Sequence, residues 1–248
     1  MMSDPDYLAD FLDYAFGKEA WERDRRNRLE ASPVVRPAKE AGLELTAEFW
    51  ALFPALSYLV SGAGVVPLTL RGGTCRLLGW RMREDDELGV GRTCGWLCQW
   101  GERELGWEDL HPHHVALLRC FGGICQYWNP VGFLMNQNPV FLASAVKPGF
   151  DGWESDLASA CAQEGRSMPL VPEDYLTFAF EANGNRTAYH RVSGEVVMFA
   201  AEDPDPGCSG LVVYPGAPEK TLYRLEGCAT FRDWVERLAR EYLEVVVA

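Results

Sequence analysis

Basic residues are scarce in this chain of 248 residues. It contains 23 Lys and Arg against 36 Asp and Glu, which leaves a formal charge of −13 at neutral pH. A charge of that sign repels phosphate backbones and anionic lipid headgroups within about one Debye length. The same charge accelerates encounter with a basic protein. The composition therefore favours a protein partner and argues against nucleic acid and membrane surfaces.

Signals of secretion and of membrane insertion are also missing. The N-terminus (MMSDPDY) is acidic where a signal peptide needs basic residues followed by an apolar run. Eight Cys are too small a fraction of the chain for a disulfide scaffold. The uncharged segment 49–70 is long enough to span a bilayer, but Pro54, Gly62, Gly64 and Pro67 interrupt it. We therefore expect a soluble cytoplasmic protein with reduced cysteines.

The hydrophobic content of 48% is enough for a full core. Helical spacing of apolar residues predicts helices over 4–30, 47–59, 114–121, 155–164 and 230–243. Strand alternation and turn residues predict strands over 65–70, 75–81, 95–100, 124–128, 175–181, 186–190, 195–200, 211–214 and 221–225. No long polar linker divides the chain. We predict one α+β domain over 1–248, with a helical extension at 1–40 and a central, mostly antiparallel sheet flanked by N- and C-terminal helices.

One stretch has the residue types of a zinc finger. Cys94 and Cys98 are followed after twelve residues by His111, with His114 close behind. A finger needs three to five residues between its His ligands, and here the gap is two at most and contains Pro112. We therefore predict no metal and no other cofactor, and we interpret these residues as buried thiols and a polar His-rich loop. A zinc- or thiol-dependent enzyme at Cys94, Cys98 and His111 is kept as an alternative.

Other catalytic patterns are not found in the sequence. The glycines of 89–95 (GVGRTCG) do not have the spacing of a dinucleotide fingerprint, and no Gly-rich segment carries a P-loop Lys. There is no GxSxG nucleophile elbow, and His190 falls within a predicted strand. We predict no catalytic residues.

Four segments occur in a familiar order: 119–124 (RCFGGI), 172–189 (PEDYLTFAFEANGNRTAY), 193–199 (SGEVVMF) and 229–238 (ATFRDWVERL). With this order, residues 110–243 resemble the SUKH (Smi/Knr-type) superfamily. The resemblance implies an α+β fold with a central antiparallel sheet, used mainly as a protein-binding scaffold. Many bacterial members are immunity proteins that neutralise a polymorphic toxin, often a nuclease, and fungal members act in cell-wall signalling.

The resemblance and the charge together predict a non-enzymatic, immunity-type protein that neutralises a toxin, which the acidic charge suggests is basic. A signalling scaffold without a toxin is a second alternative. The aromatic residues Trp107, Tyr127 and Trp128 are candidates for contacting the partner, because large rings bury much area at little entropic cost. The sequence does not indicate an oligomeric state.

Overall fold

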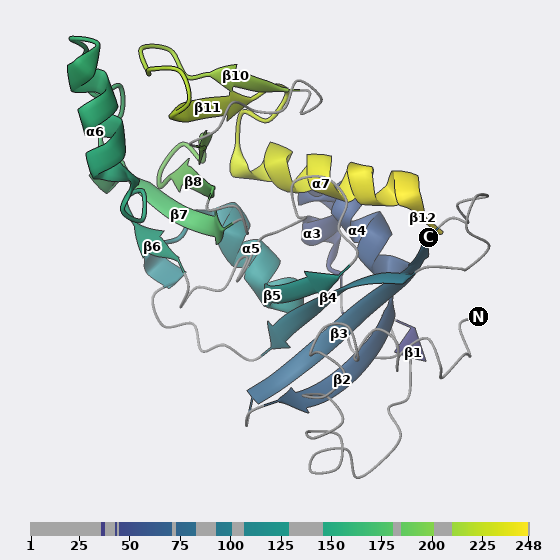
Figure 1. Cartoon of the computed structure of the whole chain (residues 1–248). Coiled ribbons are helices and arrows are strands. Elements are labelled where there is room, and N and C mark those ends of the chain that lie inside the picture. Colours follow the sequence, from purple (N-terminus) through teal and green to yellow (C-terminus); the bar gives the residue numbers. More distant parts are fainter. Residues whose placement is uncertain are drawn as a thin grey trace, which may run out of the picture.

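The computed structural model describes residues 36–37, 43, 45–70, 73–82, 93–100, 107–128, 146–180, 185–200 and 210–247. Within these ranges the chain forms two antiparallel sheets that pack with helices (Figure 1). The prediction of an α+β fold with antiparallel strands is confirmed, and the strands divide between two sheets instead of lying in one. The predicted helical extension over 1–40 lies outside the described residues, apart from a short strand at 36–37.

The first sheet, here called the N-sheet, has the strand order β1-β2-β3-β4-β5, and β12 pairs with the end of β3. Its strands are β1 (Arg36–Pro37), β2 (Gly64–Leu70), β3 (Gly73–Met82), β4 (Thr93–Trp100), β5 (Gly123–Trp128) and β12 (Val246–Val247). Val65, Leu78 and Trp96 are cross-strand neighbours and all three are buried. One face of the N-sheet therefore contributes directly to the core.

The second sheet, here called the C-sheet, has the strand order β10-β11-β9-β8-β7-β6. Its strands are β6 (Lys147–Pro148), β7 (Tyr175–Phe180), β8 (Arg186–His190), β9 (Val196–Phe199), β10 (Leu211–Val213) and β11 (Leu222–Leu225). The predicted three-stranded meander is confirmed as β7, β8 and β9. Gly194 in the turn between β8 and β9 has a φ of 71°, where a residue with a side chain is strained.

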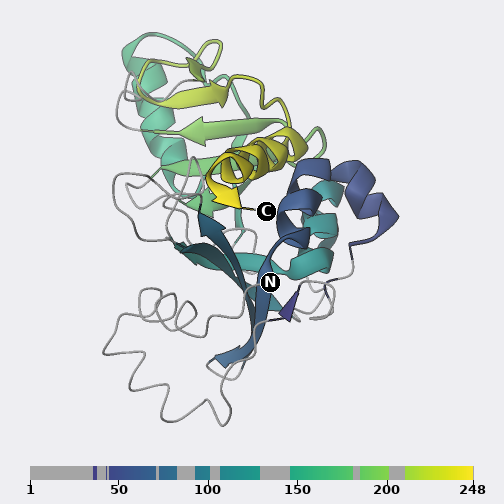
Figure 2. The same ribbon diagram turned by 90° about the vertical axis from the view of Figure 1, so that its right-hand side faces the viewer.

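Four helices pack with both sheets in one core. They are α3 (Ala47–Leu52), α4 (Pro54–Ser61), α5 (Pro112–Phe121) and α7 (Phe231–Val245). The core cluster joins Phe53 and Trp80 from the N-terminal half to Phe178, Tyr189 and Trp234 from the C-terminal half. Helix α6 (Trp153–Gln163) packs on the other face of the C-sheet, so α7 lies in front of that sheet and α6 behind it in Figure 2. Two 3-10 turns, η1 (Trp107–Asp109) and η4 (Pro172–Asp174), complete the described elements.

The single helix predicted over 47–59 is wrong, because the structure breaks it into α3 and α4. Phe53 lies between them with φ −129° and ψ 70°. Pro54 occupies the start of α4, where its missing N–H leaves no hydrogen bond unmade, and its ring disfavours the helical conformation at Phe53. The uncharged segment 49–70 is thus divided among short helices and β2. None of the helices in the described ranges is both long and apolar enough to cross a membrane.

Helix α7 begins with the capping box that the sequence predicts. The Thr230 hydroxyl accepts a hydrogen bond from the Asp233 N–H at 3.3 Å, and the Asp233 carboxylate accepts one from the Thr230 N–H at 3.1 Å. Two of the N–H donors at this helix end are thereby satisfied. The apolar stripe of α7 is buried through Phe231, Trp234 and Tyr242.

Glu236 is a carboxylate on α7 that is only 2% exposed. Its two oxygens accept hydrogen bonds from the backbone N–H groups of Ala55 and Leu56, each at 3.1 Å. Helix α4 has no side-chain cap of its own, so Glu236 satisfies donors that the first turn of α4 leaves unpaired. The negative charge also suits the positive end of the α4 dipole. Glu236 therefore fixes α4 against α7.

We expect Glu236→Ala to lower the free energy of unfolding by about 1–3 kcal/mol, because it leaves the buried Leu56 N–H and the partly buried Ala55 N–H without this acceptor. The matched control is Glu164→Ala, which removes a carboxylate from a solvent-exposed ion pair with Arg166 and should change stability by less than about 1 kcal/mol. Urea denaturation of the three proteins measures the difference. Equal losses in both variants would contradict the capping role.

Candidate functional site

Helix α6 covers only part of its face of the C-sheet. Leu157 of α6 lies in a buried cluster with Val197 and Leu222. Because side chains alternate along a strand, Glu195 shares the face of Val197, and Arg224 shares the face of Leu222. Glu195 is partly exposed and Arg224 is exposed. This polar end of the α6 face is the candidate functional site.

The carboxylate of Glu195 accepts hydrogen bonds from two tyrosine hydroxyls. Tyr175, at the start of β7, donates to Oε2 at 3.2 Å, and Tyr214, directly after β10, donates to Oε1 at 3.3 Å. The two rings approach Glu195 from strands on either side of β9. The orientation of the carboxylate is therefore set by three separate segments of the C-sheet.

The same contacts keep both phenols protonated. Burial raises the pKa of Tyr175 above its ordinary value, and the negative charge of Glu195 raises it further. Burial and Glu195 also raise the pKa of Tyr214. Neither hydroxyl is therefore prepared to act as a base or a nucleophile near neutral pH. They serve as hydrogen-bond donors that hold a carboxylate at an open surface.

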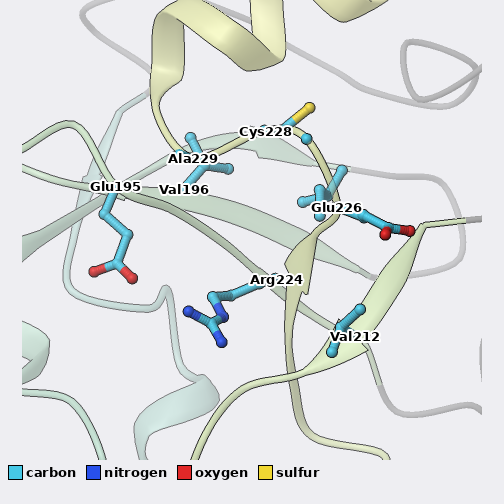
Figure 3. Close-up of a pocket in the computed structure, with 9 residues that line it drawn as sticks. Glu195, Val196, Val212, Arg224, Glu226, Cys228 and Ala229 are labelled. Carbon is cyan, nitrogen blue, oxygen red and sulfur yellow. The ribbon is translucent and has the colours of Figure 1, made fainter.

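A pocket of about 500 Å³ opens beside Glu195. Figure 3 shows the side chain of Arg224 between those of Glu195 and Glu226, and Val212 also lines the pocket. The guanidinium carbon lies 5.4 Å from the centre of the Tyr214 ring, within cation–π range. The pocket thus presents two carboxylates and one guanidinium on an open face. This arrangement suits recognition of a polar or charged group.

Cys228 belongs to the pocket wall, but its thiol does not serve the opening. Figure 3 shows its sulfur directed toward α7, and Sγ donates to the Asp233 carbonyl oxygen at 3.9 Å. Burial raises the pKa of the Cys228 thiol, although Arg237 acts in the opposite direction. Burial likewise raises the pKa of Cys120 to about 12. A nucleophilic thiol needs a lowered pKa, so these two cysteines do not support a thiol enzyme.

The residues of the finger-like spacing lie on two different elements. Cys94 and Cys98 lie in β4, whereas His111 and His114 lie at the start of α5. Cys98 is buried and not in a disulfide, and the side chain of Cys94 lies outside what the structure describes. Among the described residues, no group of three or more His, Cys, Asp or Glu side chains is arranged to hold a metal ion.

The histidines of α5 instead join that helix to the C-sheet. The His111 Nδ1 accepts a hydrogen bond from the His113 N–H at 3.3 Å, and a Cβ on Gly194 would lie 3.0 Å from the His111 Nε2. His114 is fully buried, with its Nδ1 3.0 Å from the Tyr189 hydroxyl. Burial lowers the pKa of His111, and the neighbouring His113 lowers it further. Burial also lowers the pKa of His113.

The aromatic residues proposed to contact a partner belong to other elements than those that line this pocket. Trp107 begins η1, and Tyr127 and Trp128 end β5, paired with Trp96 and Gly95 of β4. The side chains of Trp107, Tyr127 and Trp128 lie outside the described part of the chain. Their role in binding stays a prediction.

Comparison of the chain with protein-family models, curated proteins and solved structures found no match. Sequence patterns did not single out Glu195, Tyr175, Tyr214 or Arg224 as site residues. Their grouping depends on the pairing of β7 through β11, which brings distant segments together. One local feature of the sequence bears on the site. The turn at Gly194 marks the start of β9, and alternation of side chains along that strand places Glu195 on the α6 face.

We expect the buried thiols at 98, 120, 161 and 228 to resist iodoacetamide in the native protein at pH 7.5 and to react fully in urea. The reason is that burial keeps the reagent away from the sulfur atoms and disfavours the reactive thiolate form. Peptide mass spectrometry resolves each site. Rapid native modification of Cys98 would contradict this account and restore the thiol-enzyme alternative at Cys94, Cys98 and His111.

The histidines also predict a pH dependence of stability. A group whose pKa is lowered by folding contributes stability above its unfolded pKa, roughly 6.5 for His, and that stability is lost as the pH falls below it. We therefore expect the Tm to fall between pH 7.5 and 5.5 as His111 and His113 become protonated in the unfolded chain. In His113→Gln the fall should be smaller. Identical pH slopes for both proteins would contradict the assignment.

Proposed function

We propose that this chain is a non-enzymatic, cytoplasmic protein-binding domain of the immunity type, which neutralises a basic toxin by binding it. The observation that carries the proposal is the open pocket on the C-sheet, where Glu195 is held in place by two tyrosine hydroxyls. A carboxylate positioned in this way is a ready acceptor for a Lys or Arg side chain of a partner. The resemblance of residues 110–243 to the SUKH superfamily supports the same function.

The charge of the chain supports a basic partner. Its formal charge of −13 attracts a positively charged protein over the distance at which encounter complexes form. Toxins that cleave nucleic acid bind phosphates through Lys and Arg, so their working surfaces are basic. A protein that covers such a surface blocks the toxin without any chemical step.

The enzyme alternative draws less support from the described residues. The phenols at the pocket have raised pKa values, and so do the thiols of Cys120 and Cys228. Groups of this kind donate hydrogen bonds more readily than they attack a substrate. A signalling scaffold would use the same type of surface and differs only in the identity of its partner.

Co-expression tests the proposal directly. Each toxin domain encoded in the genome that carries this chain is induced in a laboratory bacterium with or without the chain, and survival is counted. We expect the chain to restore growth against one toxin and to co-purify with it at equal stoichiometry. Rescue by catalytic breakdown of the toxin, or no rescue in any pair, would contradict the immunity function.

Within a rescued pair, we expect the double variant Glu195→Gln/Glu226→Gln to weaken binding roughly tenfold, because two charge-assisted contacts are lost. The matched control is Glu48→Gln/Glu108→Gln, which makes the same charge change at exposed positions on α3 and η1. Isothermal titration calorimetry gives both affinities. Equal weakening in the two variants would show that overall charge matters and that the pocket does not.

A further inference from the structure

Strand β10 is an edge of the C-sheet among the described residues, and β11 is its one neighbouring strand there. The Tyr214 N–H donates to the Leu222 carbonyl at 2.9 Å, and the Glu226 N–H donates to the Gly210 carbonyl at 2.6 Å. In an antiparallel pair, residues whose backbone groups face the neighbouring strand alternate with residues whose backbone groups face away from it. Since Gly210 and Tyr214 bond to the segment of β11, the N–H and C=O groups of Leu211 and Val213 point away from β11. None of these outward groups forms a backbone hydrogen bond to another described residue.

Among the edge strands in the described residues, β6 and β1 are blocked in ways that β10 is not, whereas β5 (GICQYW) also lacks proline and charge. Edge strand β6 consists of Lys147–Pro148, and edge strand β1 consists of Arg36–Pro37. Proline removes a ladder donor, a charged side chain resists desolvation, and two residues offer little length for pairing. Strand β10 has the sequence LVV, with no proline and no charge.

Two of the three side chains of β10 are exposed, one on each face of the sheet, while Leu211 is partly buried against the core. Val212 is 50% exposed on the face that carries the pocket, and Val213 is 36% exposed on the opposite face. A strand placed beside β10 would cover both valines and satisfy the main-chain groups of Leu211 and Val213 together. Strand addition requires donors and acceptors that no backbone group of the described residues pairs with, together with apolar side chains beside them, and β10 has both.

We propose that β10 is the docking edge for an extended, positively charged segment of a partner protein, which adds to the C-sheet as a further strand. The proposal rests on the proposed function, because it specifies how the partner binds. Side chains of the added segment alternate between the two faces of the sheet. One set lies beside Val212 on the pocket face, and the other set lies beside Val213 on the opposite face. Basic side chains on the pocket face come within reach of Glu226 and Glu195, the carboxylates that line the pocket.

Charge decides between a foreign segment and a second copy of this chain. Two copies, each with a formal charge of −13, repel one another as they approach edge to edge. The pocket beside the edge has two carboxylates and one guanidinium, so its own balance is also acidic. A basic segment is attracted both by the net charge of the chain and by the acidic pocket, and a second copy is attracted by neither.

Selection from a phage-displayed library of random dodecapeptides tests the edge even before the natural partner is identified. The wild-type chain is the bait, and the selected peptides are then titrated against Val213→Pro and Val213→Thr. Proline removes the outward N–H at a position where an edge strand tolerates it, whereas threonine keeps that N–H and the β-branched shape. We expect alternating apolar and basic peptides whose affinity falls roughly tenfold or more in Val213→Pro and less than about threefold in Val213→Thr.

Amide hydrogen exchange on the wild-type chain gives a second readout that does not depend on a variant folding. The Val212 amide, already paired with β11, should be protected with and without peptide, and the Leu211 and Val213 amides should gain protection only when peptide is bound. Peptides that bind Val213→Pro as tightly as the wild type, protection elsewhere, or no enriched peptide would each overturn the proposal. So would dimerisation of the chain that Val213→Pro abolishes. Growth rescue without protection of β10 would leave the immunity function standing and reject this edge alone.

Discussion

The buried carboxylate of Glu236 holds the start of α4 against α7. A carboxylate that is removed from water is tolerated only with strong hydrogen bonds, and here two backbone N–H groups at a helix N-terminus provide them. Arg232, one turn earlier on α7, donates to the Leu52 carbonyl at 2.7 Å, where α3 ends. Helix α7 is therefore bound to the junction between α3 and α4 through polar contacts as well as through its apolar stripe.

Helix α7 in turn relates the two sheets to each other. At one end, Trp234 lies 5.0 Å from Phe178 of the C-sheet, measured between ring centres. At the other end, Tyr242 lies 5.2 Å from Trp96 of the N-sheet. Since α7 occupies one face of the C-sheet and α6 covers only part of the other, Glu195 and Arg224 lie where no helix buries them. The candidate site is thus a consequence of how the helices are distributed over one sheet.

Features that depend on neighbouring residues were predicted well from the sequence. The turn at Gly194 defined the meander of β7 to β9, and Thr230 with Asp233 defined the start of α7. The apolar spacing of 47–59 predicts one helix because that spacing continues across Pro54, whereas the proline ring disfavours the helical conformation at Phe53. The division into two sheets and the meeting of Glu195 with Tyr214 were missed for a different reason. Both depend on which strands pair, and strand pairing between distant segments leaves no local pattern in the sequence.

We propose that this acidic chain uses its charge to find and hold a basic protein. The decisive measurement is the rate constant for association with a toxin identified by growth rescue, taken by stopped flow from low to moderate salt. The account predicts a fast rate at low salt that falls roughly tenfold or more as ionic strength rises from about 0.02 to 0.3 M. A rate that does not change over this range would contradict electrostatic capture and with it the proposed mode of recognition.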